Sequence, residues 1–248
     1  MDPTLGGHWQ QAGGRYQAVT PWSVPAALAA TIAIIVVAIL VGGQVGGLAA
    51  RRLDFGEPAV RMLASLAGLQ VTVVLLVLLA ALMFSGRPRA VLALEILPRP
   101  STVLWALGAM FSLLAVYNLA AYTLDRASVV QDLRPFAGLM RSEAAWFAAL
   151  VIGIGAPLSE ELLFRGFLQS ALARSRIGYF GASLVTTMGW TALHAGYSGT
   201  GLLEVFLIGL LLSWLLWRTG TLWVPIICHA VHNSTLLALL ATLELPPA

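Results

Sequence analysis

Long apolar segments alternate with short polar connections along this chain. Because a helix needs about 20 mostly apolar residues to cross a bilayer, each such segment predicts a membrane-spanning helix. Two connections, "SGRPRAVLALEILPRPS" and "DRASVVQDLRPFAGLMRSE", contain arginine and proline and predict short interfacial helices. The pattern therefore predicts an all-α, polytopic transmembrane helix bundle of about seven spans, within a range of six to eight. The predicted spans lie near residues 26–49, 60–84, 103–124, 143–173, 178–195, 201–217 and 222–243.

The first predicted span contains the glycine-rich stretch "GGQVGG". Gly43 and Gly47 are four residues apart in it, which is the spacing of small residues that lets two membrane helices approach closely. We expect these two glycines to face a neighbouring helix.

Composition supports an integral membrane protein. Hydrophobic residues make up 59% of the 248 residues and charged residues only 10%, whereas an average soluble domain has about 25% charged residues. All 14 basic residues are arginines scattered along the chain, so no nucleic-acid-binding surface is expected. Their distribution does not decide the membrane orientation. The single cysteine, Cys228, excludes an intrachain disulfide and a zinc site built from thiolates.

The polar N-terminal stretch lacks the basic region of a signal peptide, so the first apolar segment is expected to remain as a span. Frequent alanine, glycine and arginine without lysine indicate a bacterial source. The predicted location is therefore the bacterial inner (cytoplasmic) membrane.

Ionisable residues inside the predicted spans concentrate in the C-terminal part of the chain. Such residues cost a few kcal/mol each to insert into a membrane, which makes them functional candidates. The candidates, with one polar neighbour, are Glu160, Glu161, Arg165, His194, Glu204, His229, His232 and Asn233.

The segment "SEELLFRGF" holds two adjacent glutamates and an arginine. On a helix, Glu161 precedes Arg165 by four residues, which is the favourable order for an ion pair. Glu160 is rotated by about 100° from Glu161 and faces elsewhere. We interpret Glu161 and Arg165 as a self-neutralising pair that supports the site. Glu160 then has no local partner and suits a general base.

The same residues permit a purely structural interpretation. Ser159 is a good helix N-cap, and the two glutamates would then lie in a first turn, facing the positive end of the helix dipole. Arg165 would be an ordinary partner on the helix surface. This motif alone does not distinguish the two interpretations.

Two later segments place polar groups one helical turn apart: "WTALH" pairs Trp190 with His194, and "HAVHN" pairs His229 with Asn233. Because each buried polar group needs a partner, their convergence with Glu160 is difficult to explain by packing alone. It predicts a hydrolytic site. Glu160 and His194 would hold and deprotonate a water, while His229 and Asn233 would donate to the oxyanion.

A metal-dependent mechanism is also open. Glu160, His194 and His229 supply the N/O ligand set of a catalytic zinc, or another divalent metal, with an open position. The chain contains no His-Glu-x-x-His motif, so it does not look like the better-known zinc intramembrane proteases.

The three motifs "EELLFRG", "WTALH" and "RTGTLWVPIICHAVHN" resemble those of the CAAX protease and bacteriocin-processing (CPBP, or Abi) family of intramembrane proteases. That family has Glu-Glu-x-x-x-Arg, Phe-x-x-x-His and His-x-x-x-Asn in this order, and here Trp190 stands in place of the phenylalanine. The resemblance implies an intramembrane endopeptidase, often called a metalloprotease, with Glu160 as base, His194, His229 and Asn233 in the site, and Glu161 with Arg165 in support.

The resemblance covers the region from about residue 142 to residue 243. We therefore expect an N-terminal part of polar tail and three spans (1–141), a catalytic core of about four spans (142–243) and a short tail (244–248). The implied partners are the lipid bilayer and a membrane-anchored protein or peptide substrate.

Two other interpretations remain open. "GYSG" resembles the Gly-x-Ser-Gly of rhomboid-like intramembrane serine proteases, with Ser198 as nucleophile and His229 or His232 as base. Alternatively, a transporter or immunity protein could use the Glu/His cluster as a proton relay, although a relay has no need for Asn233. His232 and Cys228 are expected to be packing residues.

Overall fold

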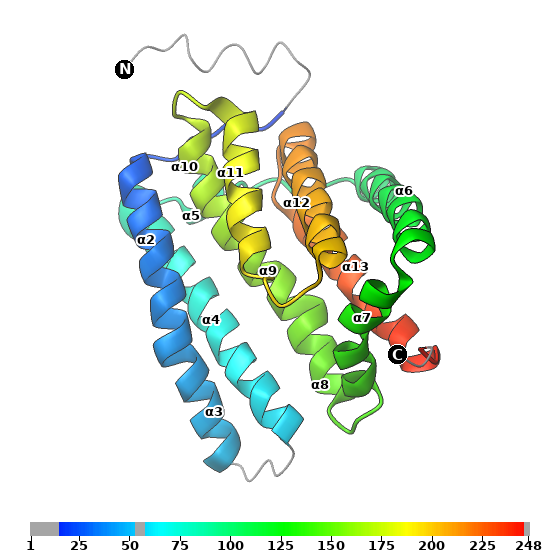
Figure 1. Cartoon of the computed structure of the whole chain (residues 1–248). Coiled ribbons are helices and arrows are strands. Elements are labelled where there is room, and N and C mark those ends of the chain that lie inside the picture. Colours follow the sequence, from blue (N-terminus) through cyan, green and yellow to red (C-terminus); the bar gives the residue numbers. More distant parts are fainter. Residues whose placement is uncertain (1–14, 53–57, 246–248) are drawn as a thin grey trace.

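The computed structural model describes residues 15–52 and 58–245, and every regular element in this part of the chain is helical (Figure 1). The prediction of an all-α fold is confirmed. Most of the predicted N-terminal tail and the end of the predicted C-terminal tail lie outside the described residues. The elements are α2 (Val24–Val37), η2 (Ala38–Gly42), α3 (Gly43–Arg52), α4 (Pro58–Ser85), α5 (Pro88–Val91), α6 (Pro100–Leu124), α7 (Arg126–Met140), α8 (Ala145–Leu150), η3 (Val151–Gly155), α9 (Ala156–Glu160), η4 (Glu161–Leu168), α10 (Gln169–Ala173), α11 (Gly178–Ala192), α12 (Gly199–Thr219) and α13 (Trp223–Thr242).

Six helices in the described part of the chain are long and apolar enough to cross a membrane. The expected range of six to eight spans is therefore met. The predicted span near 178–195 is α11, whose 15 residues reach about 22 Å, short of a hydrocarbon core of about 30 Å. The six are Val24–Arg52, Pro58–Ser85, Pro100–Leu124, Ala145–Ala173, Gly199–Thr219 and Trp223–Thr242.

The helix Ala145–Ala173 runs through the middle of the bundle (Figure 1). Half of its apolar window is buried, a larger share than in the other five candidate spans. The hairpin of α2–α3 and α4 lies on one side of it, and α6 lies on the opposite side, with α11, α12 and α13 between (Figure 1). The central helix carries the "SEELLFRGF" segment, so this arrangement surrounds that segment with other helices.

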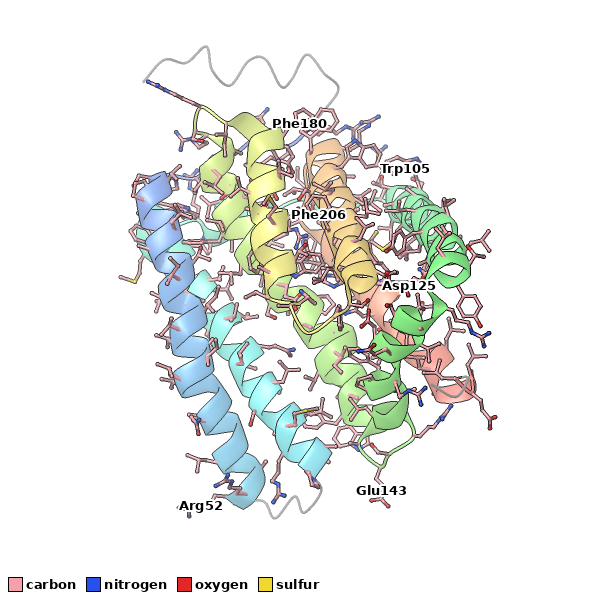
Figure 2. The ribbon with its side chains drawn as sticks, in the orientation of Figure 1. Arg52, Trp105, Asp125, Glu143, Phe180 and Phe206 are labelled. Atoms are coloured by element: carbon pink, nitrogen blue, oxygen red, sulfur yellow. The ribbon has the colours of Figure 1, made fainter. Side chains whose placement is uncertain are left out.

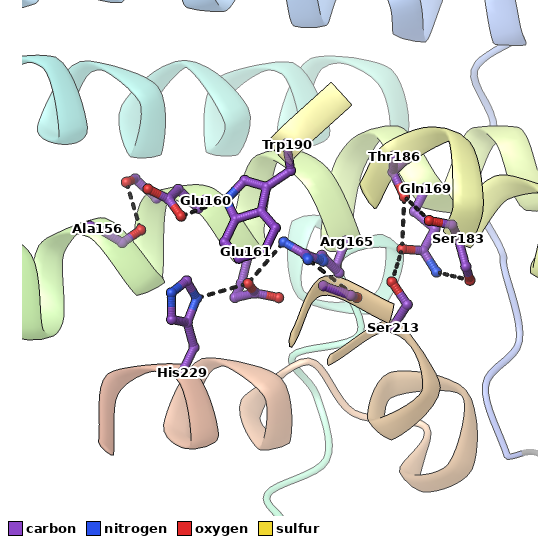
Figure 3. Close-up of polar contacts among 12 residues, drawn as sticks. Ala156, Glu160, Glu161, Arg165, Gln169, Ser183, Thr186, Trp190, Ser213 and His229 are labelled. Atoms are coloured by element: carbon purple, nitrogen blue, oxygen red, sulfur yellow. Dashed lines mark hydrogen bonds and ion pairs between the residues drawn. The ribbon is translucent and has the colours of Figure 1, made fainter. Parts of the chain in front are cut away.

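A buried polar network fastens the central helix to its neighbours (Figure 3). The Gln169 amide on α10 donates to the Ser183 hydroxyl on α11 at 3.0 Å. Its carbonyl oxygen accepts from Thr186 on α11 and from Ser213 on α12. Satisfied buried polar groups hold helices in one register, because any slip would strand them without partners.

The first hairpin packs through glycines. An added Cβ at Gly42 would overlap Thr72 and the Gly68 carbonyl of α4, and one at Gly46 would overlap the Ala64 carbonyl. The predicted contact residue Gly43 has no neighbour on α4 closer than 3.9 Å, whereas Gly47 meets the Ser65 hydroxyl. The closest contact thus falls on Gly42 and Gly46, the pair with the same four-residue spacing one position earlier.

We expect Gly46→Ala to lower the free energy of unfolding by about 1–3 kcal/mol, because the new methyl group meets backbone that cannot move aside. Gly108→Ala is the matched control. An added Cβ there meets open space, so the same change should be neutral or stabilise by up to about 1 kcal/mol. Thermal unfolding of the two variants in detergent measures the difference, and equal effects would contradict the packing described.

Candidate active site

The "SEELLFRGF" segment lies inside a continuous helix. The Ser159 hydroxyl donates to the carbonyls of Gly155 and Ala156, so it does not cap a helix start. The structural interpretation with Ser159 as N-cap is therefore wrong. Glu161–Leu168 forms a π-helix whose eight residues are all buried. Such wide turns are rare and occur often at functional sites.

Glu161 and Arg165 form the predicted ion pair. The Arg165 Nη1 atom donates to Glu161 Oε1 at 3.0 Å, and both side chains are fully buried. The guanidinium also donates to the Gly209 carbonyl of α12 at 3.3 Å and lies 4.4 Å from the ring centre of Trp190. A charge so completely buried needs this many partners, since removing it from water is costly.

His229 joins the same carboxylate from α13. Its Nδ1 atom lies 3.0 Å from Glu161 Oε1, the oxygen that also accepts from Arg165 (Figure 3). A carboxylate at Nδ1 fixes the orientation of an imidazole and leaves Nε2 for chemistry. The sequence interpretation grouped His229 with Glu160, whereas the direct partner of His229 is Glu161.

Glu160 has a partner that the sequence interpretation did not assign. The indole Nε1 of Trp190 donates to Glu160 Oε2 at 2.7 Å (Figure 3). Glu160 was expected to have no local partner, and Trp190 is a neutral partner that lies 30 residues away on another helix. The other oxygen, Oε1, is left for a different donor. Trp190 thus supplies a hydrogen bond that a phenylalanine at this position could not supply.

His194 and Asn233 are both held by backbone carbonyls. His194 Nδ1 lies 3.0 Å from the Trp190 carbonyl oxygen. Since a carbonyl only accepts, this nitrogen carries the proton, and Nε2 of the neutral ring is an acceptor. The Asn233 amide donates to the Ile152 carbonyl at 3.0 Å, which leaves one N–H and the amide oxygen for other partners.

These side chains share the wall of a cavity of about 690 Å³. Glu160, Trp190, His194, His229 and Asn233 all line it, while the buried Glu161 and Arg165 lie behind the wall. The adjacent glutamates therefore occupy different environments. Glu160 is accessible from the cavity, and Glu161 is fixed between Arg165 and His229.

The candidate metal ligands do not fit a metal centre as they are placed. Within residues 15–52 and 58–245, no group of three or more His, Cys, Asp or Glu side chains is arranged to hold a metal ion. The reaction proposed for this site uses side chains and a water.

Ser198, the nucleophile of the serine-protease alternative, caps α12. Its hydroxyl accepts from the Gly201 N–H at 3.1 Å and donates to Asp132 Oδ2 at 2.6 Å. Cys228 is fully buried, as expected of a packing residue. His232 departs from that expectation because it lines the cavity, and its buried Nδ1 atom has no hydrogen-bond partner among the described residues.

Sequence reasoning missed the contribution of the N-terminal half to the cavity. Asn118 on α6 and Asp132 on α7 line the same wall as Glu160. Asn118 donates to Glu204 at 2.8 Å. One signal was available: Asn118 is a lone strongly polar residue inside a predicted span, where such groups are rare.

Comparison with known proteins agrees with the motifs. Residues 142–235 match the model of a family described as type II CAAX prenyl endopeptidase Rce1-like. For this segment, the match confirms the resemblance inferred from the motifs. An Escherichia coli protein described as an uncharacterized 24.3 kDa protein is 32% identical over 143 residues, which cover 55% of this chain and 62% of that protein. The chain thus spans about three fifths of the length of the curated relative that it matches. No solved structure matches the chain.

We expect Arg165→Met to lower the free energy of unfolding by about 3–5 kcal/mol, because it strands the buried Glu161 carboxylate. Adding Glu161→Gln removes the stranded charge and should recover part of the loss. Unfolding in detergent measures both, with Arg176→Met at an exposed site as control. Strictly additive losses in the double variant would contradict the pairing.

Proposed function

We propose that this chain is an intramembrane endopeptidase that hydrolyses a peptide bond of a membrane-associated protein or peptide. The observation that carries the proposal is the wall of the cavity. There, Glu160 on α9, His194 in the turn after α11, and His229 with Asn233 on α13 line one cavity among helices that are apolar enough to span a membrane. The match of residues 142–235 to a prenyl endopeptidase family supports the same reaction class.

Glu160 is the proposed general base, and His194 helps to hold the water. Glu160 Oε1 remains available because Oε2 accepts from Trp190. His194 Nε2 is an acceptor because Nδ1 carries the proton. A water between two acceptors gives one hydrogen to each, and Glu160 takes its proton as the oxygen attacks.

The attack forms a carbon–oxygen bond at the substrate carbonyl and places negative charge on the carbonyl oxygen. The free N–H of Asn233 and a protonated Nε2 of His229 are the proposed donors to this oxyanion. The Glu161 carboxylate lies 3.0 Å from Nδ1 on the other side of the ring and orients the imidazole. The carbon–nitrogen bond then breaks, and Glu160 returns its proton to the leaving amine.

The proposed substrate is anchored in a membrane, because the cavity lies among helices that are themselves apolar enough to span one. The composition and the Escherichia coli relative support a bacterial inner membrane as the location. We therefore propose a bacterial membrane protein or membrane-bound peptide as the substrate.

We expect Glu160→Gln to abolish cleavage and leave the fold intact, since the amide oxygen still accepts from Trp190 Nε1 while the base is lost. The uncleaved substrate should accumulate in native membranes that contain the variant, where comparative proteomics identifies it. Glu143→Gln, at the exposed site labelled in Figure 2, is the matched control.

Ser198→Ala serves as a second control and should retain cleavage. If Ser198→Ala abolishes cleavage while Glu160→Gln does not, the serine-protease alternative replaces this proposal. If no protein accumulates in Glu160→Gln membranes relative to wild type, the proposed proteolysis is wrong.

We expect Trp190→Phe to reduce the turnover number by roughly tenfold to a hundredfold, because Glu160 loses the donor that orients it. The aromatic packing beside Arg165 is largely kept, so the melting temperature should fall only modestly. Trp105→Phe on the outside of α6 is the matched control and should leave turnover unchanged. Equal turnover of the two variants would refute an orienting role for Trp190.

A further inference from the structure

Glu204 is an ionisable residue in a membrane-spanning helix that the proposed chemistry does not use. It lies in the second turn of α12, about 7 Å along the axis from Gly199, and lines the cavity that contains Glu160. This position is beyond the first turn, where the helix dipole acts on charges. A carboxylate here needs another reason.

The hydrogen bond from Asn118 does not neutralise Glu204. The amide Nδ2 of Asn118 donates to Glu204 Oε1 at 2.8 Å and also to the Leu114 carbonyl at 3.1 Å. A neutral amide fixes the position of a carboxylate but brings no positive charge. If the only role of Glu204 were to join α12 to α6 by a hydrogen bond, a glutamine at this position would serve equally well. Asn118 therefore supplies no positive charge to this side chain.

The charges around Glu204 are uniformly negative. Among the described residues that line the cavity, four are carboxylates and none is arginine, although the chain has more arginines than acidic residues. Burial first, and then the negative charges of Glu160, Asp132 and Glu204, raise the pKa of the Tyr197 phenol in the loop before α12 to about 12. The carboxylates are Asp132, Glu160, Glu204 and Glu244.

His232 provides an independent observation on the same wall. Its Nδ1 atom is buried without a hydrogen-bond partner among the described residues. That nitrogen has almost no accessible surface, so a group in the cavity meets other atoms of the imidazole. A guanidinium carries five N–H donors and can bind both oxygens of a carboxylate.

Much of the remaining cavity wall is apolar. Leucines in the C-terminal part of α13 and aromatic and aliphatic side chains of α6 and α7 form it. An apolar stretch of chain fits this part, whereas the polar side chains lie on several elements, among them α12 and the N-terminal part of α13. The apolar residues include Leu236, Leu237, Leu240, Phe111, Leu133 and Phe136.

We propose that the cavity selects a membrane-inserted peptide in which a basic side chain adjoins an apolar run, and that Glu204 binds the cation. Glu204 is thus a specificity residue for the proposed endopeptidase, on which this inference rests. Asn118 positions the carboxylate. The apolar run lies along the leucines of α13, and the basic residue lies beside Glu204.

Binding, rather than cleavage, tests this proposal. The probe is a short fluorescent leucine–alanine peptide with one arginine, and its partner carries citrulline, the neutral isostere of arginine. Binding is measured by fluorescence anisotropy in detergent. The protein carries Glu160→Gln, so that the peptide stays intact and the result does not depend on whether the chain cleaves.

We expect the arginine peptide to bind more tightly than the citrulline peptide, and Glu204→Gln to weaken the arginine peptide by roughly tenfold or more. Citrulline binding should not change, because glutamine keeps the acceptor for Asn118. The control Glu143→Gln removes an exposed charge outside the cavity and should alter neither peptide. Unaltered melting temperatures show that the variants fold.

Two results would overturn the inference. One is equal binding of the arginine and citrulline peptides. The other is a preference for arginine that Glu204→Gln leaves intact. A third experiment tests whether the amine headgroup of a lipid occupies the site instead. It compares the thermal stability of the protein in nanodiscs of phosphatidylethanolamine and of phosphatidylcholine. Stabilisation by ethanolamine lipid that depends on Glu204, with no preference for the arginine peptide, would assign the site to lipid and refute the peptide proposal.

Discussion

The buried charge of Arg165 is the constraint around which the other elements are arranged. A guanidinium with no exposed surface in an apolar bundle is tolerated only when it is paired and hydrogen-bonded. Its partners come from each neighbouring element: Glu161 on the same helix, the Gly209 carbonyl on α12 and the ring of Trp190 on α11. Through Glu161, the cluster also reaches His229 on α13. Four helices are therefore held in one register by one ionic cluster, at the point where the cavity begins.

This cluster separates two adjacent glutamates into different roles. Glu161 spends one oxygen on both Arg165 and His229 and is closed off from the cavity. Glu160, one residue earlier, accepts from Trp190 and faces the cavity. Trp190 contacts both sides of this division, because its ring lies against the Arg165 guanidinium while its N–H donates to Glu160. A shift of the supporting ion pair would therefore reach the proposed base through a single rigid indole, without any direct contact between Arg165 and Glu160.

Local sequence patterns were sufficient to predict the features that depend on residues close together in the chain. Apolar lengths predicted the spans, and the spacing of Glu161 and Arg165 predicted their ion pair. Contacts between helices could not be predicted in this way. The Glu160–Trp190, Glu161–His229 and Asn118–Glu204 contacts join residues 30, 68 and 86 positions apart. The three motifs placed the residues of the first two contacts in one site. However, the sequence interpretation paired His229 with Glu160, whereas its direct partner is Glu161. Spacing likewise could not choose between two glycine pairs, and the closest contact with α4 falls on Gly42 and Gly46 instead of Gly43 and Gly47.

The cavity extends beyond the segment that matches a known family. Residues 142–235 contain the groups proposed for the chemistry, whereas Asn118 and Asp132, on α6 and α7, lie before that segment and line the same wall. Asp132 holds α7 against the start of α12 through two hydrogen bonds to Ser198, and Asp125 adds another through Thr200. The hydrogen bond from Thr200 is the largest cause of the lowered pKa of Asp125, so this contact favours an ionised carboxylate. The matched segment thus carries the groups proposed for bond cleavage, and the helices outside it complete the cavity in which we propose that the substrate binds. We expect a relative that kept the motifs but changed α6 and α7 to retain the proposed reaction and to accept a different peptide.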